Sequence, residues 1–521
     1  MSVTGFDPVI EVDHTISVLR APEPVVAIVR HFVSYQKERL PPIPVQAAIR
    51  SYFGDNQRTG SRSDVWAVLG DRATRAAMGA TGFDPDALDL RMVDASCRGQ
   101  GFWDGWERLV TPSGKFPAGL QGHVERILRF RCGLRPIIRD LRPPPPRPQP
   151  ICAPPSLYPF QAEAVAAFLA GGQGVIDLPP RSGKTRIAVA IVAATGFPTL
   201  FVAPHKGLAR QTAAVFAQHF GDHTVALLTG GEQGVRTRRR LPSQLIWVAT
   251  PKTAAGLPGI ESRQLLVIDE FHHAAADTWK DVAARCKGAW WRLGLTGTHF
   301  RADGRDMEMA GVIGRALYSR SVSDMVAVGR VVPARVAMLR VGGDRVTGKG
   351  WYKDGVVLSD NRNQTLIWAA NQLVQAGKRV LCLVKQVEHG RAIVARIPGA
   401  VFVSGESGDG TDAALAALER RQVTAVVGTS VIGEGRDVPA ADALVYFAGG
   451  KSEVGHTQDY YRVLTASPGK THGIVVDAAD THSDALLSHS AERLQHYREE
   501  RCFTAEVMDW TAFPGWLAKV A

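Results

Sequence analysis

A lysine and a threonine that directly follow a glycine are the residues of this chain best placed to hold a phosphate. The apolar run Val175–Leu178 predicts a buried strand, and Gly183, Lys184 and Thr185 then open the alanine-rich helical run 186–194. Backbone N–H groups at a helix start, a lysine ammonium and a hydroxyl on Mg²⁺ together suit a triphosphate. An ordinary helix start with a solvated lysine is the alternative.

Two consecutive carboxylates, Asp269 and Glu270, follow the apolar run Leu265–Ile268. In nucleotide hydrolases one such carboxylate holds Mg²⁺ through water and the other orients and deprotonates the attacking water, and we predict these roles here. A solvated acidic turn is the alternative, which the phosphate loop upstream disfavours. Zinc at His272 and His273 is disfavoured, because adjacent histidines point in different directions and further ligands are missing.

A second set of candidate residues lies far downstream of the first. The segment 429–439 follows an apolar run and carries hydroxyls and small residues, and Glu434, Gly435 and Asp437 could face a nucleotide across an interdomain cleft. The guanidinium of Arg462 could neutralise charge that develops on a γ-phosphate, as an arginine finger does. A surface arginine is the alternative for this residue.

Short apolar runs that alternate with helical stretches must position these residues. Such alternation predicts parallel sheets covered by helices, with ligand groups at the carboxyl ends of the strands. The runs form two series: Val175–Leu178, Leu200–Ala203, Leu245–Ala249, Leu265–Ile268 and Leu293–Thr296, then Arg379–Val384, Ala400–Val403, Val423–Gly428, Ala443–Phe447 and Gly473–Asp477. We therefore predict an α/β protein with two successive parallel-sheet domains.

The N-terminal part of the chain has a different pattern. The run Thr15–Leu19 predicts a strand and Val25–Tyr35 a helix. The aromatic segment Gly101–Val110 could stack on bases, although packing in a small core is favoured. The proline-rich segment Arg142–Pro150 predicts an extended linker, with a ligand for a proline-recognition module as the weaker alternative.

Composition limits the classes of protein to be considered. The chain has 521 residues and a formal charge of +11, which fits a polyanionic partner but also mere solubility. The scattered cysteines are Cys97, Cys132, Cys152, Cys286, Cys382 and Cys502. They contain no C-x-x-C pair, which disfavours a zinc site or a disulfide framework. Residues 1–14 do not resemble a signal peptide and no apolar run is long enough to span a membrane, so we expect a cytoplasmic protein.

The phosphate loop, the acidic pair and the arginine stand in a fixed order with other short segments. These are Leu157–Gln161, Pro179–Thr185, Val202–Pro204 with Leu208 and Gln211, Ala249–Thr253, Asp269–His272, Leu293–Thr298 with Arg301–Gly304, Thr429–Pro439, and Gln458–Arg462. In this order they resemble motifs Q, I, Ia, Ic, II, III, V and VI of superfamily 2 helicases of the DExH type. The resemblance covers about residues 156–500 and implies two tandem RecA-like domains preceded by a small α+β domain.

The resemblance also implies cofactors and residue roles. ATP and Mg²⁺ are expected, with Thr185 and Asp269 at the metal. The catalytic residues would be Lys184, Asp269, Glu270, His272 and Arg462. The nucleotide-binding residues would be Gln161, Pro179, Pro180, Arg181, Ser182, Gly183, Lys184, Thr185, Arg186, Glu434, Gly435, Asp437, Gln458 and Arg462. The nucleic-acid-binding residues would be Pro204, His205, Arg210, Thr250, Pro251, Ser404, Gly405, Thr429 and Ser430. The basic run 236–240 could extend this surface or be a solvated loop.

A narrower likeness is to the UvsW-type helicases of T-even-like phages and their relatives near the XPB branch. The segments that carry it are Phe102–Gly105, Phe116–Leu120, Asn361–Asn363, Val387–Gly390 and Val403–Gly405. It implies a helicase that remodels branched or forked DNA in recombination and fork repair, in the host cytoplasm if phage-encoded. DNA is the expected partner, RNA less so, with replication or recombination proteins as further partners and no membrane.

The resemblance and the linker together predict the domain organisation. Residues 1–140 would be an accessory DNA-binding domain, 141–155 a linker, 156–325 the first RecA-like domain and 326–480 the second. Residues 481–521 would be a helical tail packed on the second domain.

Several residues depart from the family pattern. Leu178 and Arg181 replace glycines of motif I, His299 replaces a proline of motif III, and Thr465 replaces the second arginine of motif VI. A single arginine stabilises transition-state charge less well, so ATP hydrolysis could be slow or could need DNA. Two other functions therefore stay open: a nucleic-acid-binding scaffold with weakened ATPase, and a motor subunit of a restriction or defence complex.

Overall fold

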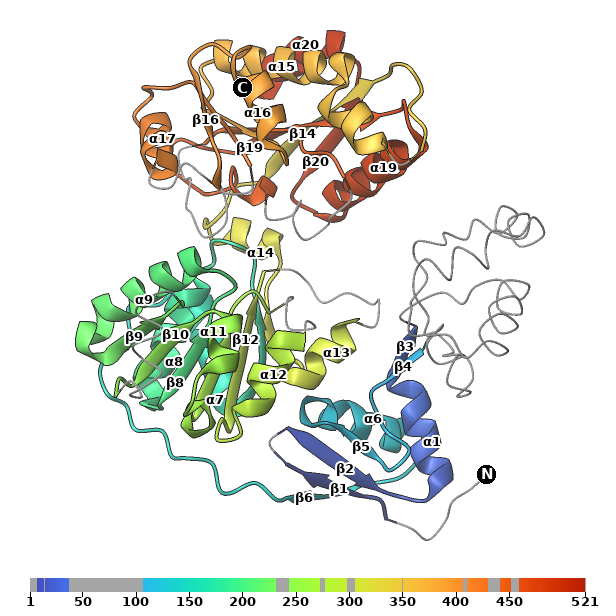
Figure 1. The fold of residues 1–521 in the computed structure, drawn as a ribbon, viewed down its shortest axis with the longest axis vertical. Coiled ribbons are helices and arrows are strands. Elements are labelled where there is room, and N and C mark those ends of the chain that lie inside the picture. Colours follow the sequence, from blue (N-terminus) through green and yellow to red (C-terminus); the bar gives the residue numbers. More distant parts are fainter. Residues whose placement is uncertain are drawn as a thin grey trace, which may run out of the picture. The chain divides into compact units, whose positions relative to one another are not determined.

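The computed structural model describes residues 7–13, 15–36, 106–230, 243–271, 277–297, 305–348, 350–405, 410–429, 441–450 and 459–520. The chain forms two compact units, one of Met1–Pro145 with Phe300–Arg315 and one of Pro146–His299 with Ala316–Ala521. Figure 1 shows the elements of both units in chain order. The predicted boundaries near residues 140, 155, 325 and 480 stay predictions.

The first unit is a small α+β domain, as predicted. Its sheet has the order β5-β2-β1-β6 and is covered by two helices. The elements are β1 (Val9–Val12), β2 (Ile16–Arg20), α1 (Glu23–Phe32), β5 (Lys115–Pro117), η2 (Ala118–Leu120), α6 (Gln121–Arg131), β6 (Ile137–Asp140) and, from the distant segment, α13 (Arg305–Val312). The core includes Val25, Val29, Phe116, Leu120 and Leu128, which are buried.

The predicted strand near residue 16 is confirmed, but the predicted helix ends earlier than expected. Helix α1 stops at Phe32, and β3 (Ser34–Gln36) then pairs with β4 (Trp106–Arg108). Tyr35 fitted the helical spacing of the sequence, but in the structure it belongs to strand β3. Residues 101–105 of the aromatic segment lie outside the described residues.

The second unit contains two seven-stranded sheets in which every strand pair is parallel. The first sheet has the order β13-β7-β12-β11-β8-β10-β9. Its strands are β7 (Gln173–Asp177), β8 (Thr199–Val202), β9 (Val225–Leu228), β10 (Ile246–Ala249), β11 (Leu265–Ile268), β12 (Trp291–Thr296) and β13 (Ala316–Ser319). Its helices are α7 (Pro159–Gly171), α8 (Lys184–Thr195), α9 (Lys206–Phe220), α11 (Pro251–Gly256), α12 (Asp277–Arg285) and α14 (Val322–Ala327).

The second sheet has the order β16-β17-β15-β18-β19-β14-β20. Its strands are β14 (Ala334–Val341), β15 (Val380–Leu383), β16 (Ala400–Val403), β17 (Ala425–Gly428), β18 (Ala443–Tyr446), β19 (Gly473–Asp480) and β20 (Thr504–Met508). Its helices are α15 (Asp360–Gln375), α16 (Val387–Val394), α17 (Gly410–Glu419), α19 (Asp484–Glu499) and α20 (Phe513–Val520). Among the described residues no helix is both long and apolar enough to cross a bilayer.

Every apolar run of the two predicted series contains a strand, which confirms the α/β class and the tandem parallel sheets. The strands β9, β13, β14 and β20 were not predicted. Strands β9, β13 and β20 are edge strands that alternate or expose their side chains, and Arg335 and Arg340 interrupt the apolar pattern of β14. The predicted tail helix is α19, but the tail also supplies β20 to the sheet.

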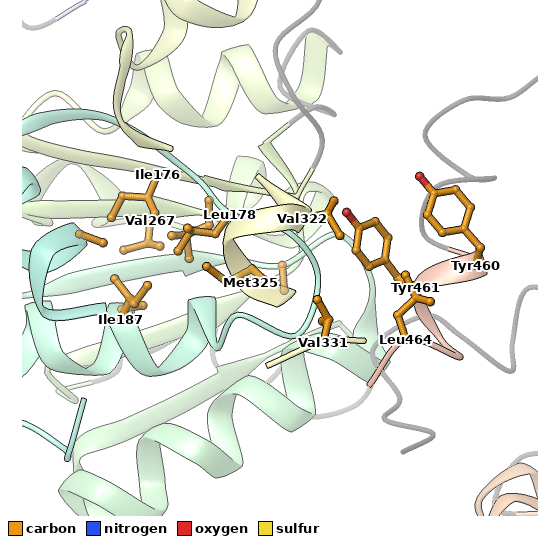
Figure 2. Packing of buried hydrophobic residues seen from close by; sticks show 14 of the residues in the cluster. Ile176, Leu178, Ile187, Val267, Val322, Met325, Val331, Tyr460, Tyr461 and Leu464 are labelled. Atoms are coloured by element: carbon orange, nitrogen blue, oxygen red, sulfur yellow. The ribbon is translucent and has the colours of Figure 1, made fainter. Parts of the chain in front are cut away.

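The segment between the two sheets, residues 320–333, is packed at both of its ends. Val322 and Met325 of α14 are buried near Leu178 of the first sheet, as Figure 2 shows. Downstream, Val332 donates its N–H to the carbonyl of Leu464 at 2.8 Å, and Val331 forms an isolated bridge with Thr465. Residues 328–330 therefore connect two firmly packed stretches of chain.

The proline-rich segment 142–150 contains neither helix nor strand. Its end is nevertheless bound to the first sheet's helix layer. Gln149 and Ile151 donate their N–H groups to the carbonyls of Thr195 and Ala193 at 2.9 and 3.0 Å. Gly196, at φ 65°, permits this approach, since a Cβ there would lie 2.4 Å from the carbonyl oxygen of Gln149.

Buried polar contacts hold α15 and α16 to the second sheet. Arg362 donates to the Asp480 carboxylate at 3.0 Å, and both side chains are fully buried. His389 Nε2–H donates to Asn363 Oδ1 at 2.8 Å, which leaves Nδ1 buried without a partner among the described residues. Burial, and the charge of Arg362, lower the pKa of His389 to about 4.

We predict that His389 makes the second sheet's domain sensitive to acid. Its pKa in the unfolded chain is near 6.5, so protonation favours unfolding once the pH falls below that value, and the loss reaches roughly 3 kcal/mol as the pH falls through 4. His389→Gln, which can still donate to Asn363, should flatten this loss. Denaturant melts of both proteins between pH 7 and pH 4 measure it, and equal slopes would refute the assignment.

Candidate functional site

The phosphate loop connects β7 to α8 and has an unusual backbone. Gly183 caps α8 at φ 79°, and Arg181 lies at φ 71°. Only glycine takes such left-handed angles without cost, and another residue costs roughly 1–2 kcal/mol. Arg181 thus keeps the backbone conformation that favours glycine, although the sequence departs from the family pattern there.

The side chain of Gln161 supports this loop through a hydrogen bond. Its side chain is buried, its carbonyl accepts the N–H of Tyr158 at 3.0 Å and its amide donates to the carbonyl of Ser182 at 2.7 Å. A Cβ on Gly183 would lie 2.5 Å from the Gln161 amide nitrogen. The residue expected to sense adenine therefore also fixes the shape of the phosphate loop.

Lys184 is the first residue of α8, and its side chain reaches back to the loop. Its ammonium donates to the carbonyls of Leu178 and Pro179 at 3.1 and 3.5 Å, and a Cβ on Gly297 would be 3.0 Å from it. The first N–H groups of α8 have no partner within the helix, and Ser182 Oγ is buried without a partner in the described part of the chain. These donors fit the phosphates of a nucleotide.

The acidic pair follows β11, two strands from β7 in the sheet. Asp269 is buried, and burial, followed by the charge of Glu270, raises its pKa to about 7 against the opposing effect of Lys184. Glu270 is at φ 47° and donates its N–H to Asp269 Oδ1 at 3.0 Å. A divalent cation beside Asp269 would favour its ionised form, so the residues present fit Mg²⁺.

The residues expected to bind nucleic acid lie after β8 and β10, on the other half of the same sheet edge. His205 caps α9, with Nδ1 accepting the N–H of Leu208 at 3.2 Å. Thr250 caps α11, where Pro251 is the first residue, and its hydroxyl lies 3.0 Å from that of Thr253. Pro204 directly follows β8 and Arg210 is exposed on α9.

In the second sheet the candidate residues again follow strands. Ser404 and Gly405 follow β16, and Thr429 follows β17. Arg462 is buried, and its guanidinium donates to Asp459 Oδ1 at 3.0 Å from Nη2 and 3.4 Å from Nε. The other predicted site residues lie outside the described residues, namely His272, Ser430, Glu434, Gly435, Asp437 and Gln458, as does the basic run 236–240.

The structure adds two residues that the sequence analysis missed. Lys385 follows β15; desolvation lowers its pKa, while the charge of Asp459 opposes the shift. Arg330, between the two sheets, lies 4.4 Å over the Tyr158 ring and donates to its hydroxyl at 2.8 Å. A lysine directly after an apolar run was a usable signal for Lys385, whereas nothing in the sequence marked Arg330.

Known proteins resemble the region that carries these residues. Residues 155–301 match the family model described as "Type III restriction enzyme, res subunit". The "DNA 3'-5' translocase XPB2" of Sulfurisphaera tokodaii is 29% identical over 166 residues, which are 32% of this chain and 36% of that protein. The "DNA 3'-5' helicase XPB" of Mycobacterium tuberculosis is 30% identical over 186 residues, 35% of this chain and 34% of the relative. The chain thus spans about a third of the length of these relatives.

Among solved structures, T4 UvsW is similar with a TM-score of 0.42 and 18% identity, over 97% of this chain and 100% of that chain. The predicted likeness to the XPB branch is found among these XPB relatives.

We predict that Gly183→Ala abolishes nucleotide binding. The new methyl group would lie 2.5 Å from the amide nitrogen of Gln161, which displaces this side chain and breaks its hydrogen bond to Ser182. The backbone of residue 183 also has a positive φ, which is unfavourable for alanine. Gly329→Ala is the matched control, because Gly329 has φ 67° but no neighbour within 4 Å. Calorimetric titration with Mg·ADP should show at least a tenfold loss for the first variant alone. Equal affinities for both variants would contradict the bracing role of Gln161.

Proposed function

We propose that this chain is a superfamily 2 helicase and an ATP-driven motor that moves along DNA. The observation that carries the proposal is the set of side chains around one sheet edge. Lys184 and the phosphate loop follow β7, Gly297 follows β12, and Asp269 and Glu270 follow β11, so three neighbouring strands end in groups suited to a metal-bound triphosphate.

Each residue has a defined task in this proposal. Lys184 and the N–H groups of α8 bind the β- and γ-phosphates, and Thr185 and Asp269 hold Mg²⁺, which when bound offsets the charge of the phosphates. Glu270 takes a proton from the attacking water as its oxygen bonds to the γ-phosphorus and the bond to the bridging oxygen breaks. The phosphate then leaves as the product.

Arg462 is the proposed arginine finger. Its guanidinium is paired with Asp459, so it has to exchange this carboxylate for the γ-phosphate. The carboxylate would then remain near Lys385, whose charge it already affects. Arg462 therefore links phosphate binding to a change of partners in the second sheet's domain.

DNA is the proposed track, gripped by residues of both sheets. The donors and caps after β8, β10, β16 and β17 suit a sugar-phosphate backbone, and contacts of this kind carry little sequence information. The XPB relatives are described as acting on DNA, which supports DNA over RNA. We further propose forked or branched DNA as the substrate, in recombination or fork repair, and the cytoplasm as its location.

A second candidate is a nucleic-acid-binding scaffold with weakened ATPase. Thr465 stands where a second arginine is usual, and its hydroxyl is buried without a partner among the described residues. Its backbone pairs with Val331, so the position already has a structural task. Phosphate release on forked DNA separates the two candidates, since measurable turnover by the natural protein removes the scaffold. The match to a restriction subunit keeps a defence motor as a third candidate.

We predict that Glu270→Gln keeps ATP binding and loses at least about 100-fold of DNA-stimulated turnover, because the amide cannot accept the proton. Phosphate release and Mg·ATP titration measure the two properties separately. Glu261→Gln is the control, since Glu261 pairs with Arg285 near the surface and should leave turnover unchanged. Full turnover in Glu270→Gln would refute the assigned base.

We also predict that DNA binding weakens steeply with salt and is indifferent to sequence. Each phosphate contact contributes about 0.9 to the slope of log affinity against log salt. Arg210→Ala should lower that slope by about one. Arg335→Ala is the control. Arg335 is an exposed arginine of β14 that donates to the hydroxyl of Thr504 in β20. Filter binding at several salt concentrations decides, and affinity that is independent of salt would contradict the proposed track.

A further inference from the structure

Helix α13 belongs to two parts of the protein at once. In the chain it connects β12 to β13, through residues 297–304 and 313–315. In space it belongs to the first compact unit, where Met307 and Ala310 pack against the core that contains Phe116 and Leu120. The small N-terminal domain therefore includes a helix that lies, in the sequence, between two strands of the first large sheet.

The two strands that α13 connects have a particular position. The sheet order places β12 and β13 on either side of β7, the strand that leads into the phosphate loop. Leu178 of the loop donates its N–H to the carbonyl of Thr296 at the end of β12, and Arg320 beyond β13 donates to that of Asp177. Both immediate neighbours of the phosphate-loop strand are therefore continuous in the chain with the segment that contains α13.

The contact between α13 and the N-terminal domain is very close. A Cβ on Gly119 in η2 would lie 2.1 Å from the carbonyl oxygen of Ala310 and 2.8 Å from that of Gly311. From the other side, a Cβ on Gly311 would lie 3.0 Å from Pro117 Cβ. Since backbone oxygens cannot move away as a flexible side chain can, only glycine at position 119 allows this contact.

The same η2 turn leads without interruption into α6. This helix exposes Arg126 and Arg129, and Phe130 at its end is 81% exposed. Exposed arginines beside an exposed aromatic ring suit the phosphates and bases of nucleic acid. A ligand on α6 would therefore act directly on η2 and on α13.

We propose that the seam between Gly119 and Gly311 couples nucleic acid on the N-terminal domain to the ATP site through α13. The inference rests on the proposed motor function and adds a regulatory role for residues that touch neither ATP nor the predicted track. Coupling of this kind is reciprocal, so nucleotide bound at the phosphate loop must alter η2 and α6 in turn.

The experiment uses three single substitutions in the full chain. Gly119→Ala forces η2 away from α13. Gly311→Ala places a methyl group of α13 against Pro117. Alanine forms helices better than glycine does, so a loss of coupling in this variant cannot come from loss of the helix. Gly122→Ala, one position after the start of α6, is the control, since nothing lies within 4 Å of a Cβ there.

Hydrogen exchange and phosphate release are measured on each protein with Mg·ADP or Mg·ATP and forked DNA. In the native chain and in Gly122→Ala, Mg·ADP should change exchange in residues 118–131. In Gly119→Ala and Gly311→Ala this response should disappear and DNA stimulation of turnover should fall at least fivefold. Mg·ADP affinity and DNA-free turnover should stay within twofold of native.

Two results would overturn the coupling. One is a native chain that binds Mg·ADP without any change in residues 118–131. The other is normal DNA stimulation in Gly311→Ala and in a folded Gly119→Ala, where exchange in β1 and β2 reports whether the N-terminal domain is intact. A native chain that binds no Mg·ADP at all would instead refute the proposed motor function.

Discussion

Parallel pairing of the strands is the constraint on which the candidate site depends. In a parallel sheet every strand ends at the same edge, so residues that are far apart in sequence meet there as soon as the strands find their order. The phosphate loop after β7 and the acidic pair after β11 come together in this way, with β12 between them. Glycine at position 297 keeps that intervening strand end clear of the Lys184 ammonium.

The charged groups of the candidate site, in both sheets, have partners within the chain or are buried. Lys184 is bonded to two loop carbonyls, Arg462 is bonded to Asp459, and burial raises the pKa of Asp269. Under the proposed function, phosphates and a divalent cation would take the place of these partners.

The sequence predicted the fold well where burial was complete and poorly elsewhere. Apolar runs, which are buried on both faces in the structure, correctly predicted strands such as β8 and β11. The edge strand β13 was missed because its exposed residues carry no such pattern. Among the candidate site residues, Lys184 and Asp269 were selected from local motifs, whereas Arg330 was added because of a contact with Tyr158 across 172 positions that no local pattern encodes. The bracing bonds of Gln161 and the seam at Gly119 are tertiary properties for the same reason.

The attachment of the proline-rich segment has a consequence for how this architecture can vary. Gln149 and Ile151 are bonded to the last turn of α8, the helix that begins at the phosphate loop, and Gly196 is required for their approach. The stretch before them, residues 142–148, makes no backbone hydrogen bond of this kind among those described. Insertions and deletions should accumulate in that stretch among relatives and stop at Gln149, where the chain becomes part of the unit that contains the first large sheet.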